Sequence, residues 1–175
     1  MEVLEKQVCP FCGKKESTLA EDEIEVPYFG KVFIFSMSCN ACGVKQSDVE
    51  AEQAKDPCRI TFTVENERDL NVRVVKSSSA SIKIPQMKMS VESGPASEGY
   101  VSNVEGLLGR FEKIIETEHD AAEEDSEKTT AKNLLKKLRK VKFGDIPLKI
   151  IIEDSTGNSA IISEKAVIEK LKGRK

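Results

Sequence analysis

The sequence contains CPFCG at residues 9–13 and CNACG at residues 39–43, two short runs of the same design. In each run two residues separate the cysteines, and a glycine follows the second cysteine directly. Thiolates at this spacing fill one edge of the tetrahedron that zinc prefers, so two pairs complete the shell. The glycines suit the positive φ of a tight turn that folds amides toward the sulfurs. We therefore predict one zinc ion bound by Cys9, Cys12, Cys39 and Cys42.

The predicted zinc is structural, because four protein ligands leave no open position for water or substrate. A redox pair or two disulfides are the alternatives, and the paired, glycine-followed spacing favours metal over both. The run at 31–38 is rich in β-branched and aromatic residues, and 21–30 leads into it through Pro27 and Gly30. Residues 1–52 are therefore predicted to form a zinc ribbon, in which the metal replaces a core that so short a segment cannot build.

Tyr28 and Phe29 stand beside Pro27 at an expected turn instead of inside a strand. One interpretation is that these aromatics pack on the ribbon or on the neighbouring domain. The other is that they form an exposed knob for a protein partner. The sequence leaves both open.

Composition narrows the class of protein. The chain has 175 residues, too few for a barrel enzyme, and 27 basic against 30 acidic residues give a formal net charge of −3. This balance gives no support to non-specific nucleic-acid binding, which needs a positive field. No apolar run approaches the roughly 18 residues of a membrane span, and the start MEVLEKQ does not resemble a secretion signal. We expect a cytoplasmic protein with no membrane association.

A second domain is predicted over residues 53–175, mainly β with a helical insertion. From Cys58 to Val64 apolar and polar residues alternate, which places Cys58 on the buried face of a strand. Further strands are predicted at 70–76, 79–84, 87–91, 147–154 and 159–163. We expect an antiparallel β-sandwich or jelly roll, a double-stranded β-helix-like fold. Residues 147–163 are expected to form a hairpin around a turn at 155–158, and residues 164–172 a short helix.

Residues 102–142 are predicted to form a helical hairpin within that β domain. Apolar residues recur at helical spacing from Val104 to Ile115 and again from Ala131 to Val141, and Ser102 with Glu105 is typical of a capping box. Eight acidic groups lie in 112–127 and seven basic groups in 128–142. This arrangement suits the dipole of the second helix, and a partner-binding charge patch is the alternative.

Catalysis has little support in the sequence. His119 is the only histidine and lies in the acidic tip of the predicted hairpin, so no histidine-based metal site can be assembled. No nucleophile elbow, phosphate loop or dinucleotide fingerprint is present. We expect a protein that is not an enzyme.

The predicted strand at 70–76 has a polar face that could contact a partner. Alternation sends Asn71 and Arg73 to one side, and Asp69 begins the same row. On a solvent-facing strand these side chains would make directional contacts with another protein. Alternatively, Asp69 and Asn71 close a local turn through bonds to the backbone.

The order of motifs resembles the ZPR-type zinc-finger family. The motifs are CPFCG, VPYFGKVFIFSMSCNACG, ERDLNVRVVKS, SIKIP and NVEGLL, within residues 9–108. The chain departs from the family pattern at Val72, where arginine is common, and at Gln86, where an acidic residue is common. The resemblance implies a four-cysteine finger followed by a β domain that bears a helical hairpin. The single module looks like the archaeal form.

The resemblance also implies a function. Family members bind translation elongation factor one-alpha, preferentially off its active state, as binding proteins or chaperones and not as catalysts. The residues that would contact this partner are the exposed or motif positions Tyr28, Phe29, Asp69, Asn71, Arg73 and Lys76.

A rival function is nucleic-acid binding by the ribbon. Lys14, Lys15, Lys31 and Lys45 would supply the phosphate contacts. Five acidic residues between positions 16 and 25 interrupt this stripe, and stacking aromatics are few. Nucleic acid is therefore the less favoured partner.

Overall fold

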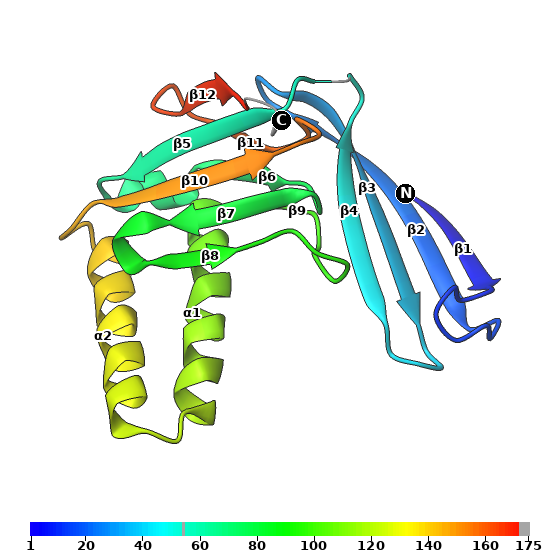
Figure 1. Ribbon diagram of the computed structural model, residues 1–175. Helices are drawn as coiled ribbons and strands as arrows, with labels where there is room; N and C mark the ends of the chain where they lie inside the picture. The colour runs from blue at the N-terminus through cyan, green and yellow to red at the C-terminus, as the bar shows by residue number, and fades with distance from the viewer. Residues whose placement is uncertain (54, 172–175) are drawn as a thin grey trace.

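The N-terminal part of the chain is a four-stranded antiparallel sheet, seen at the right of Figure 1. The computed structural model describes residues 1–53 and 55–171. The strands are β1 (Glu2–Gln7), β2 (Ser17–Val26), β3 (Gly30–Cys39) and β4 (Lys45–Ala51), in that order across the sheet. The predicted strand at 31–38 is therefore confirmed. The predicted boundary between 1–52 and 53–175 falls in the connection from β4 to the next strand.

The rest of the chain forms two antiparallel sheets and a helical hairpin, as predicted for the second domain. The five-stranded sheet runs β12 (Val167–Lys170), β5 (Cys58–Val64), β10 (Leu148–Asp154), β7 (Ala80–Ile84) and β8 (Met89–Val91). The three-stranded sheet runs β11 (Ala160–Ile161), β6 (Arg73–Lys76) and β9 (Tyr100–Asn103). Short 3₁₀ turns η1 (Glu67–Asn71) and η2 (Pro85–Met87) join these strands.

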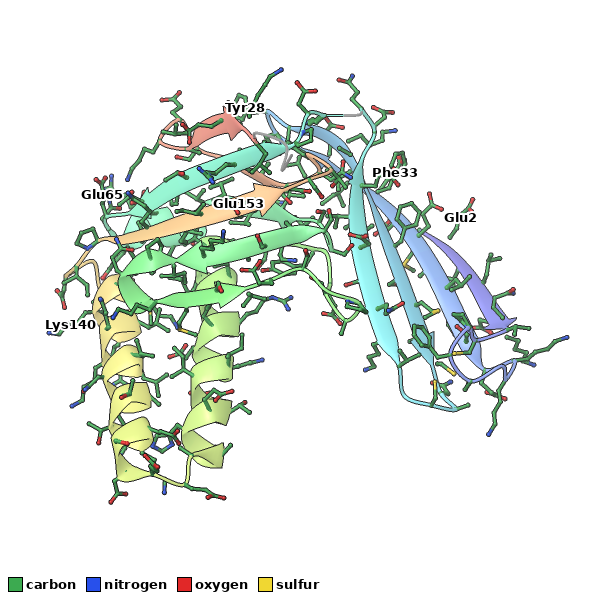
Figure 2. The ribbon with its side chains drawn as sticks, in the orientation of Figure 1. Glu2, Tyr28, Phe33, Glu65, Lys140 and Glu153 are labelled. Carbon is green, nitrogen blue, oxygen red and sulfur yellow. The ribbon has the colours of Figure 1, made fainter. Side chains whose placement is uncertain are left out.

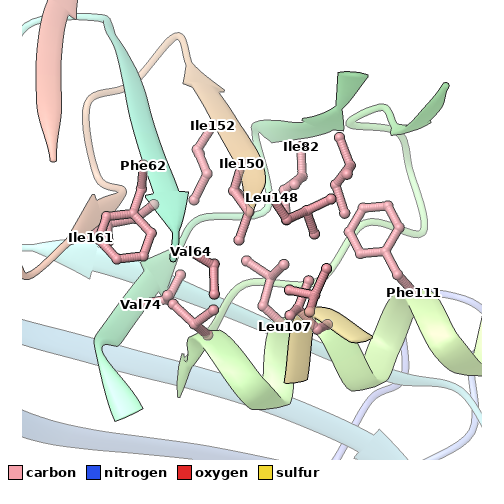
Figure 3. Packing of buried hydrophobic residues seen from close by; sticks show 14 of the residues in the cluster. Phe62, Val64, Val74, Ile82, Leu107, Phe111, Leu148, Ile150, Ile152 and Ile161 are labelled. Carbon is pink, nitrogen blue, oxygen red and sulfur yellow. The ribbon is translucent and has the colours of Figure 1, made fainter. Parts of the chain in front are cut away.

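The main core lies between these sheets and the first helix. Ile60 and Phe62 of β5 lie directly opposite Ile152 and Ile150 of β10, and all four side chains are buried. Figure 3 shows Phe62, Ile150 and Ile152 in one cluster with Leu107 from the first helix. Because β5 alternates strictly, Cys58 is buried on the same face, as predicted. Burial raises the pKa of the Cys58 thiol, as expected for an inert side chain.

The predicted hairpin consists of α1 (Val104–Ala121) and α2 (Asp125–Lys142), which project from the sheets side by side (Figure 1). The predicted cap is wrong by one residue. Asn103 is the N-cap, and its side chain accepts a hydrogen bond from the Gly106 amide. Ser102 still belongs to β9, where it pairs with Val74 of β6. Among the described residues, neither helix has the length and apolar character needed to cross a membrane.

Three sequence predictions for this domain are wrong. Residues 67–71 form η1, so the strand predicted at 70–76 begins only at Arg73. The segment predicted to form a C-terminal helix, residues 164–172, instead contains the strand β12, because residues 167–170 pair with the free edge of β5. Residue 172 lies outside the described residues. The expected hairpin at 147–163 is absent from the described chain, since β10 pairs with β5 and β7 whereas β11 pairs with β6.

A smaller apolar cluster joins the ribbon to the jelly-roll part. Val26, Val32 and Val49 of the ribbon pack with Val75 and Ala160. All five side chains are at least 95% buried. These two parts therefore share apolar surface instead of being joined by the connecting chain alone.

Hydrogen bonds extend this contact along β4. The Gly99 amide donates to the Ser47 carbonyl at 2.8 Å, and the Ser47 hydroxyl donates to the Gly99 carbonyl at 2.8 Å. The Ser78 amide donates to Asp48 Oδ1 at 2.7 Å. The loop between β8 and β9, which contains Gly99, thus approaches the edge of the ribbon sheet, as Figure 1 shows.

A fully buried carboxylate, that of Asp154, stabilises the connection between β10 and β11. Asp154 accepts hydrogen bonds from the hydroxyls of Ser77, Ser79, Thr156 and Ser159 and from the Thr156 amide. Burial alone would raise the pKa of Asp154, but the hydroxyls of Ser159 and Thr156, the Thr156 amide and the Ser77 hydroxyl outweigh it and lower that pKa. The ionised form therefore stabilises the fold.

We expect Asp154→Asn to lower the free energy of unfolding at pH 7 by about 2 kcal/mol, because the amide removes the charge and places donors against donors. Since the folded pKa is lowered, the carboxylate's contribution is complete above the ordinary pKa of about 4 and is lost as the pH falls through the folded value. Urea unfolding at several pH values should show the gap between parent and variant narrowing below about pH 4. Exposed Asp145→Asn is the control; an equal effect there would contradict the assignment.

Gly99→Ala should separate the ribbon from the jelly-roll part. A Cβ at Gly99 would lie 2.5 Å from Asp48 Oδ1 and 2.7 Å from the Val49 amide nitrogen, whereas a Cβ at Gly94 meets nothing within 4 Å. We expect Gly99→Ala to lower the free energy of unfolding by about 1–3 kcal/mol and Gly94→Ala to leave it nearly unchanged. Denaturant unfolding of both variants checks this; equal stabilities would show that the approach is not tight.

Candidate metal centre

The two cysteine pairs lie on matching turns at one end of the ribbon sheet. In the first turn the Cys9 amide donates to the Lys14 carbonyl at 2.9 Å and the Gly13 amide to the Cys9 carbonyl at 2.8 Å. In the second, Cys39 and Gly43 repeat these bonds with the Val44 and Cys39 carbonyls at 3.0 and 2.9 Å. Both glycines have a φ of 72°. The glycines thus occupy the left-handed backbone region that the sequence predicts for them.

The four sulfurs form a cluster of the size that zinc requires. All four Sγ atoms lie within 4.8 Å of one another, and Cys9–Cys42 and Cys12–Cys39 are separated by 3.8 Å between sulfurs. With zinc–sulfur bonds of about 2.3 Å, the edge of a regular tetrahedron is about 3.8 Å. The donor set and its spacing therefore fit one zinc ion. Figure 2 draws sulfurs in yellow at this end of the sheet.

The charges of the cluster also favour a cation. Burial opposes ionisation of Cys9, but the amides of Cys12 and Phe11 and the neighbouring thiols outweigh it and lower the pKa of Cys9 to about 7. The Val44 amide favours a Cys42 thiolate, but burial and the three other sulfurs outweigh it and raise the pKa of Cys42 to about 11. Four packed thiolates repel one another, so a divalent ion is needed to hold them all ionised.

The site is closed, so its role is structural. Cys9 and Cys39 are buried, Cys12 is half-buried and Cys42 is exposed. Bound zinc would fix the ends of all four ribbon strands in one turn-to-turn contact, and four thiolates would leave it no free coordination position. The Ser17 hydroxyl is buried without a hydrogen-bond partner among the described residues, and Ser17 lies opposite Cys39 in the sheet.

The lysines of the rival nucleic-acid interface do not form one surface with a shared role. Lys14, Lys15 and Lys45 are exposed close to the zinc turns. Lys31 is at the opposite end of β3, where its ammonium lies 3.4 Å from a Glu23 carboxylate oxygen.

At the turn Pro27–Phe29, one of the two aromatic side chains packs inside the molecule and the other is exposed. Phe29 packs against the ribbon–jelly-roll cluster, and the Lys55 ammonium lies 3.2 Å from the centre of its ring. Tyr28 is fully exposed, with a relative accessibility of 102% and a φ of 65°. Figure 2 labels Tyr28 at the end of the sheet opposite the sulfurs. Only Tyr28 therefore has the placement of an exposed knob.

The predicted row Asp69, Asn71 and Arg73 is not a row on a strand. Asp69 is buried in η1, and its carboxylate accepts bonds from the amides of Glu65 and Asn66 and from the Lys165 ammonium. Burial alone would raise the pKa of Asp69, but the Lys165 contact and the Glu65 amide lower it. The local-turn interpretation is thus confirmed for Asp69, whereas Asn71 and Arg73 are exposed.

Lys76 is buried, which the sequence does not indicate. Its ammonium donates to the carbonyls of Ser77 and Glu98 and to the Ser97 hydroxyl. Burial lowers the pKa of Lys76, although Asp154 and Asp48 oppose this. Lys76 thus ties β6 to the β8–β9 loop and is not part of a free surface.

Two carboxylates that hold these segments, Asp154 and Asp48, are missing from the predicted site residues. Besides partners nearby in sequence, Asp154 accepts a hydrogen bond from the Ser77 hydroxyl, and Asp48 accepts bonds from the amide and hydroxyl of Ser78. The sequence carries no local signal for these two pairings, because Ser77 lies 77 positions from Asp154 and Ser78 lies 30 positions from Asp48.

Comparison with known proteins places both parts of this chain. The sequence model described as the ZPR1 zinc-finger domain matches residues 2–56, and the one described as the ZPR1 jelly-roll domain matches residues 68–173. An uncharacterized ZPR1-like protein of Methanocaldococcus jannaschii is 40% identical over 94% of this chain and 83% of its own length. One of Pyrococcus horikoshii is 38% identical over 93% and 75%. The zinc finger chaperone zpr1 of Schizosaccharomyces pombe is 30% identical over 89% of this chain, which spans 34% of that protein.

We expect the purified protein to contain one zinc per chain, and Cys39→Ala to lose it together with the folded ribbon, because three thiolates leave the shell incomplete. Cys58→Ala is the matched control: its zinc content should stay at one, while the small void costs ~1 kcal/mol of stability. Metal analysis by plasma mass spectrometry and urea unfolding measure the two quantities. Loss of zinc from Cys58→Ala, or two disulfides without zinc in the parent, would contradict the ligand assignment.

Proposed function

Because this chain belongs to the ZPR1 family of zinc-finger proteins, we propose that it binds translation elongation factor one-alpha in the cytoplasm and acts as its chaperone or regulator. The motifs from CPFCG to NVEGLL support this partner through the family resemblance. The name of the fission yeast relative, a zinc finger chaperone, supports a chaperone role. We also infer that the chain is not an enzyme, in keeping with a zinc site that four thiolates close.

The observation that carries a protein-binding function is the state of Tyr28. A non-glycine residue in the left-handed region costs conformational energy, and Tyr28 has a φ of 65°. No hydrogen bond or ring contact from another described residue to its side chain offsets this cost. Exposed tyrosines of this kind are enriched at protein interfaces, where burial of the ring supplies the energy.

Arg73 is the second proposed anchor. It begins β6 opposite Asn103 of β9, and its carbonyl accepts a hydrogen bond from the Ile162 amide. These bonds hold the backbone, while the side chain is exposed and has no ion pair among the described residues. A guanidinium in this position is ready to bind a carboxylate of a partner.

The coupling of ribbon and jelly-roll part supports a shared interface. A standard interface buries about 800 Å² per partner, which is a large share of a ribbon of this size. Because the valine cluster joins the two parts, a partner would meet them in a fixed arrangement. The proposal therefore requires the complete chain, and neither part alone should suffice.

Tyr28→Ala should weaken binding to the cognate elongation factor about tenfold or more with little change in salt dependence, because an apolar anchor is lost. Arg73→Ala should weaken binding and also reduce its salt dependence. Titration calorimetry at two salt concentrations, with GDP or GTP present, measures both effects. Phe143→Ala removes another exposed aromatic ring, at the end of α2, and should bind like the parent.

Circular dichroism should show that each variant is folded. If the folded Tyr28 and Arg73 variants bind like the parent, the proposed surface is wrong. If the parent protein fails to bind the elongation factor both when GDP is present and when GTP is present, the proposed partner is wrong. Recovery of salt-labile RNA from native cytosol, without the elongation factor, would support the rival nucleic-acid function.

A further inference from the structure

One face of the ribbon sheet forms an open groove of about 480 Å³ that is distinct from the Tyr28 turn. We call it the ribbon groove. Its floor comes from β1, β2, β3 and β4, and Gly94, Pro95 and Ser97 of the β8–β9 loop form one wall. That wall is held against β4, since the Gln46 side-chain amide donates to the Pro95 carbonyl at 3.4 Å.

Strand register sets the chemistry of the floor as two adjacent rows. One row is apolar: Leu4 lies opposite Leu19, and Leu19 lies opposite Met37. The next row on the same face places Glu2 opposite Glu21, which in turn lies opposite Phe35. Leu4 is 59% exposed and both Leu19 and Phe35 are 38% exposed. Apolar surface and acidic groups therefore lie side by side, open to solvent.

The Glu2–Glu21 pair is unfavourable within this chain. Like charges directly opposite each other on antiparallel strands destabilise a sheet. Among the ion pairs of the described residues, none involves Glu2 or Glu21, and no basic residue lines the groove. Replacement of Glu21 by a neutral residue would relieve the repulsion at no cost to packing. A cation supplied from outside would relieve it equally well.

We propose that the ribbon groove binds a segment of a partner protein in which a lysine or arginine lies beside apolar side chains. The cationic group would sit between Glu2 and Glu21, and the apolar side chains would cover Leu4, Leu19 and Met37. Charge complementarity selects this occupant, because acidic groups repel the phosphates of nucleic acid. A flat sheet floor with one wall buries too little of a small molecule, whereas a peptide lies along it.

This site does not depend on the identity of the partner proposed above. It concerns a different face of the ribbon and a class of segment, so either proposal can fail while the other holds. The residues of the groove are also separate from the zinc ligands, which keeps the metal centre intact in variants of the groove.

The first experiment measures binding of short fluorescein-labelled peptides to the zinc-loaded full chain by fluorescence anisotropy. Three peptides of equal length combine lysine with leucine, glutamate with leucine, and lysine with serine. The lysine–leucine peptide should bind most tightly. The double variant Glu2→Gln, Glu21→Gln should bind this peptide about tenfold more weakly at low salt. The double variant Leu4→Ser, Leu19→Ser should also bind it more weakly, and by the same factor at low and at high salt.

Matched controls separate the groove from general charge and hydrophobicity. Glu123→Gln with Glu124→Gln removes the same charge at the hairpin tip, and Val167→Ser with Ile168→Ser removes exposed apolar side chains from β12. Both double variants should bind the lysine–leucine peptide within about twofold of the parent. An equal loss in a control variant and its groove counterpart would overturn the proposal.

A methionine-methyl NMR spectrum locates the bound peptide independently. The chain has four methionines, and only Met37 lies in the groove, whereas Met87 is buried in the jelly-roll core. The Met37 signal should shift on addition of the lysine–leucine peptide and the Met87 signal should not. An unmoved Met37 signal at saturation would overturn the proposal.

Thermal unfolding adds a readout that moves in the opposite direction. Because the Glu2–Glu21 pair is repulsive, Glu21→Gln should raise the unfolding temperature at low salt while it weakens peptide binding. A lowered unfolding temperature would show that Glu21 stabilises the ribbon by itself, and the inference from charge frustration would fail.

Discussion

Four mutually repelling thiolates that need one divalent cation are the constraint on which the ribbon depends. The zinc turns lie at the end of the sheet that is remote from the shared valine cluster. Of the four cysteines in these turns, Cys9 and Cys39 are buried and the other two are not. The amides of Phe11 and Cys12 favour a thiolate at Cys9, and the Val44 amide favours one at Cys42. Metal binding and formation of the ribbon are therefore one process, and the rest of the sheet builds from its two turns toward the jelly-roll part.

At the other end of the ribbon, buried polar groups take the place of metal. Asp154 accepts hydrogen bonds from hydroxyls in two chain segments, Asp48 holds Ser78 across the domain contact, and Lys76 ties β6 to the β8–β9 loop. Asp154 and Lys76 are buried and Asp48 is half-buried, and each has its partners, so loss of a partner of Asp154 or Lys76 would leave a buried charge unsatisfied. The arrangement of ribbon and jelly roll is thus specified by polar bonds as well as by the valine contact.

The two surfaces that we propose for partners carry costs that the isolated fold does not recover. Tyr28 has a left-handed backbone with a fully exposed ring, and Glu2 faces Glu21 without a cation. Lys6 of the ribbon also has a positive φ, 55°, whereas at Gly13 and Gly43 the local preference and the fold agree. Departures of this kind are expected where a sequence serves binding in addition to folding. Placed at separate positions on the ribbon, they allow one chain to present two different contacts.

The zinc ligands, the strand at Cys58–Val64 and the helical stripes could be predicted from the sequence, because they depend on spacing within one turn, strand or helix. Packing between distant segments, in contrast, decided that residues 167–170 pair with β5 as a strand and that Asp69 closes a turn. It also decided that Lys76 is buried. The reason is physical: the edge of β5, the Lys165 ammonium and the Glu98 carbonyl supply the partners, and these groups come within reach only once segments remote in sequence have met.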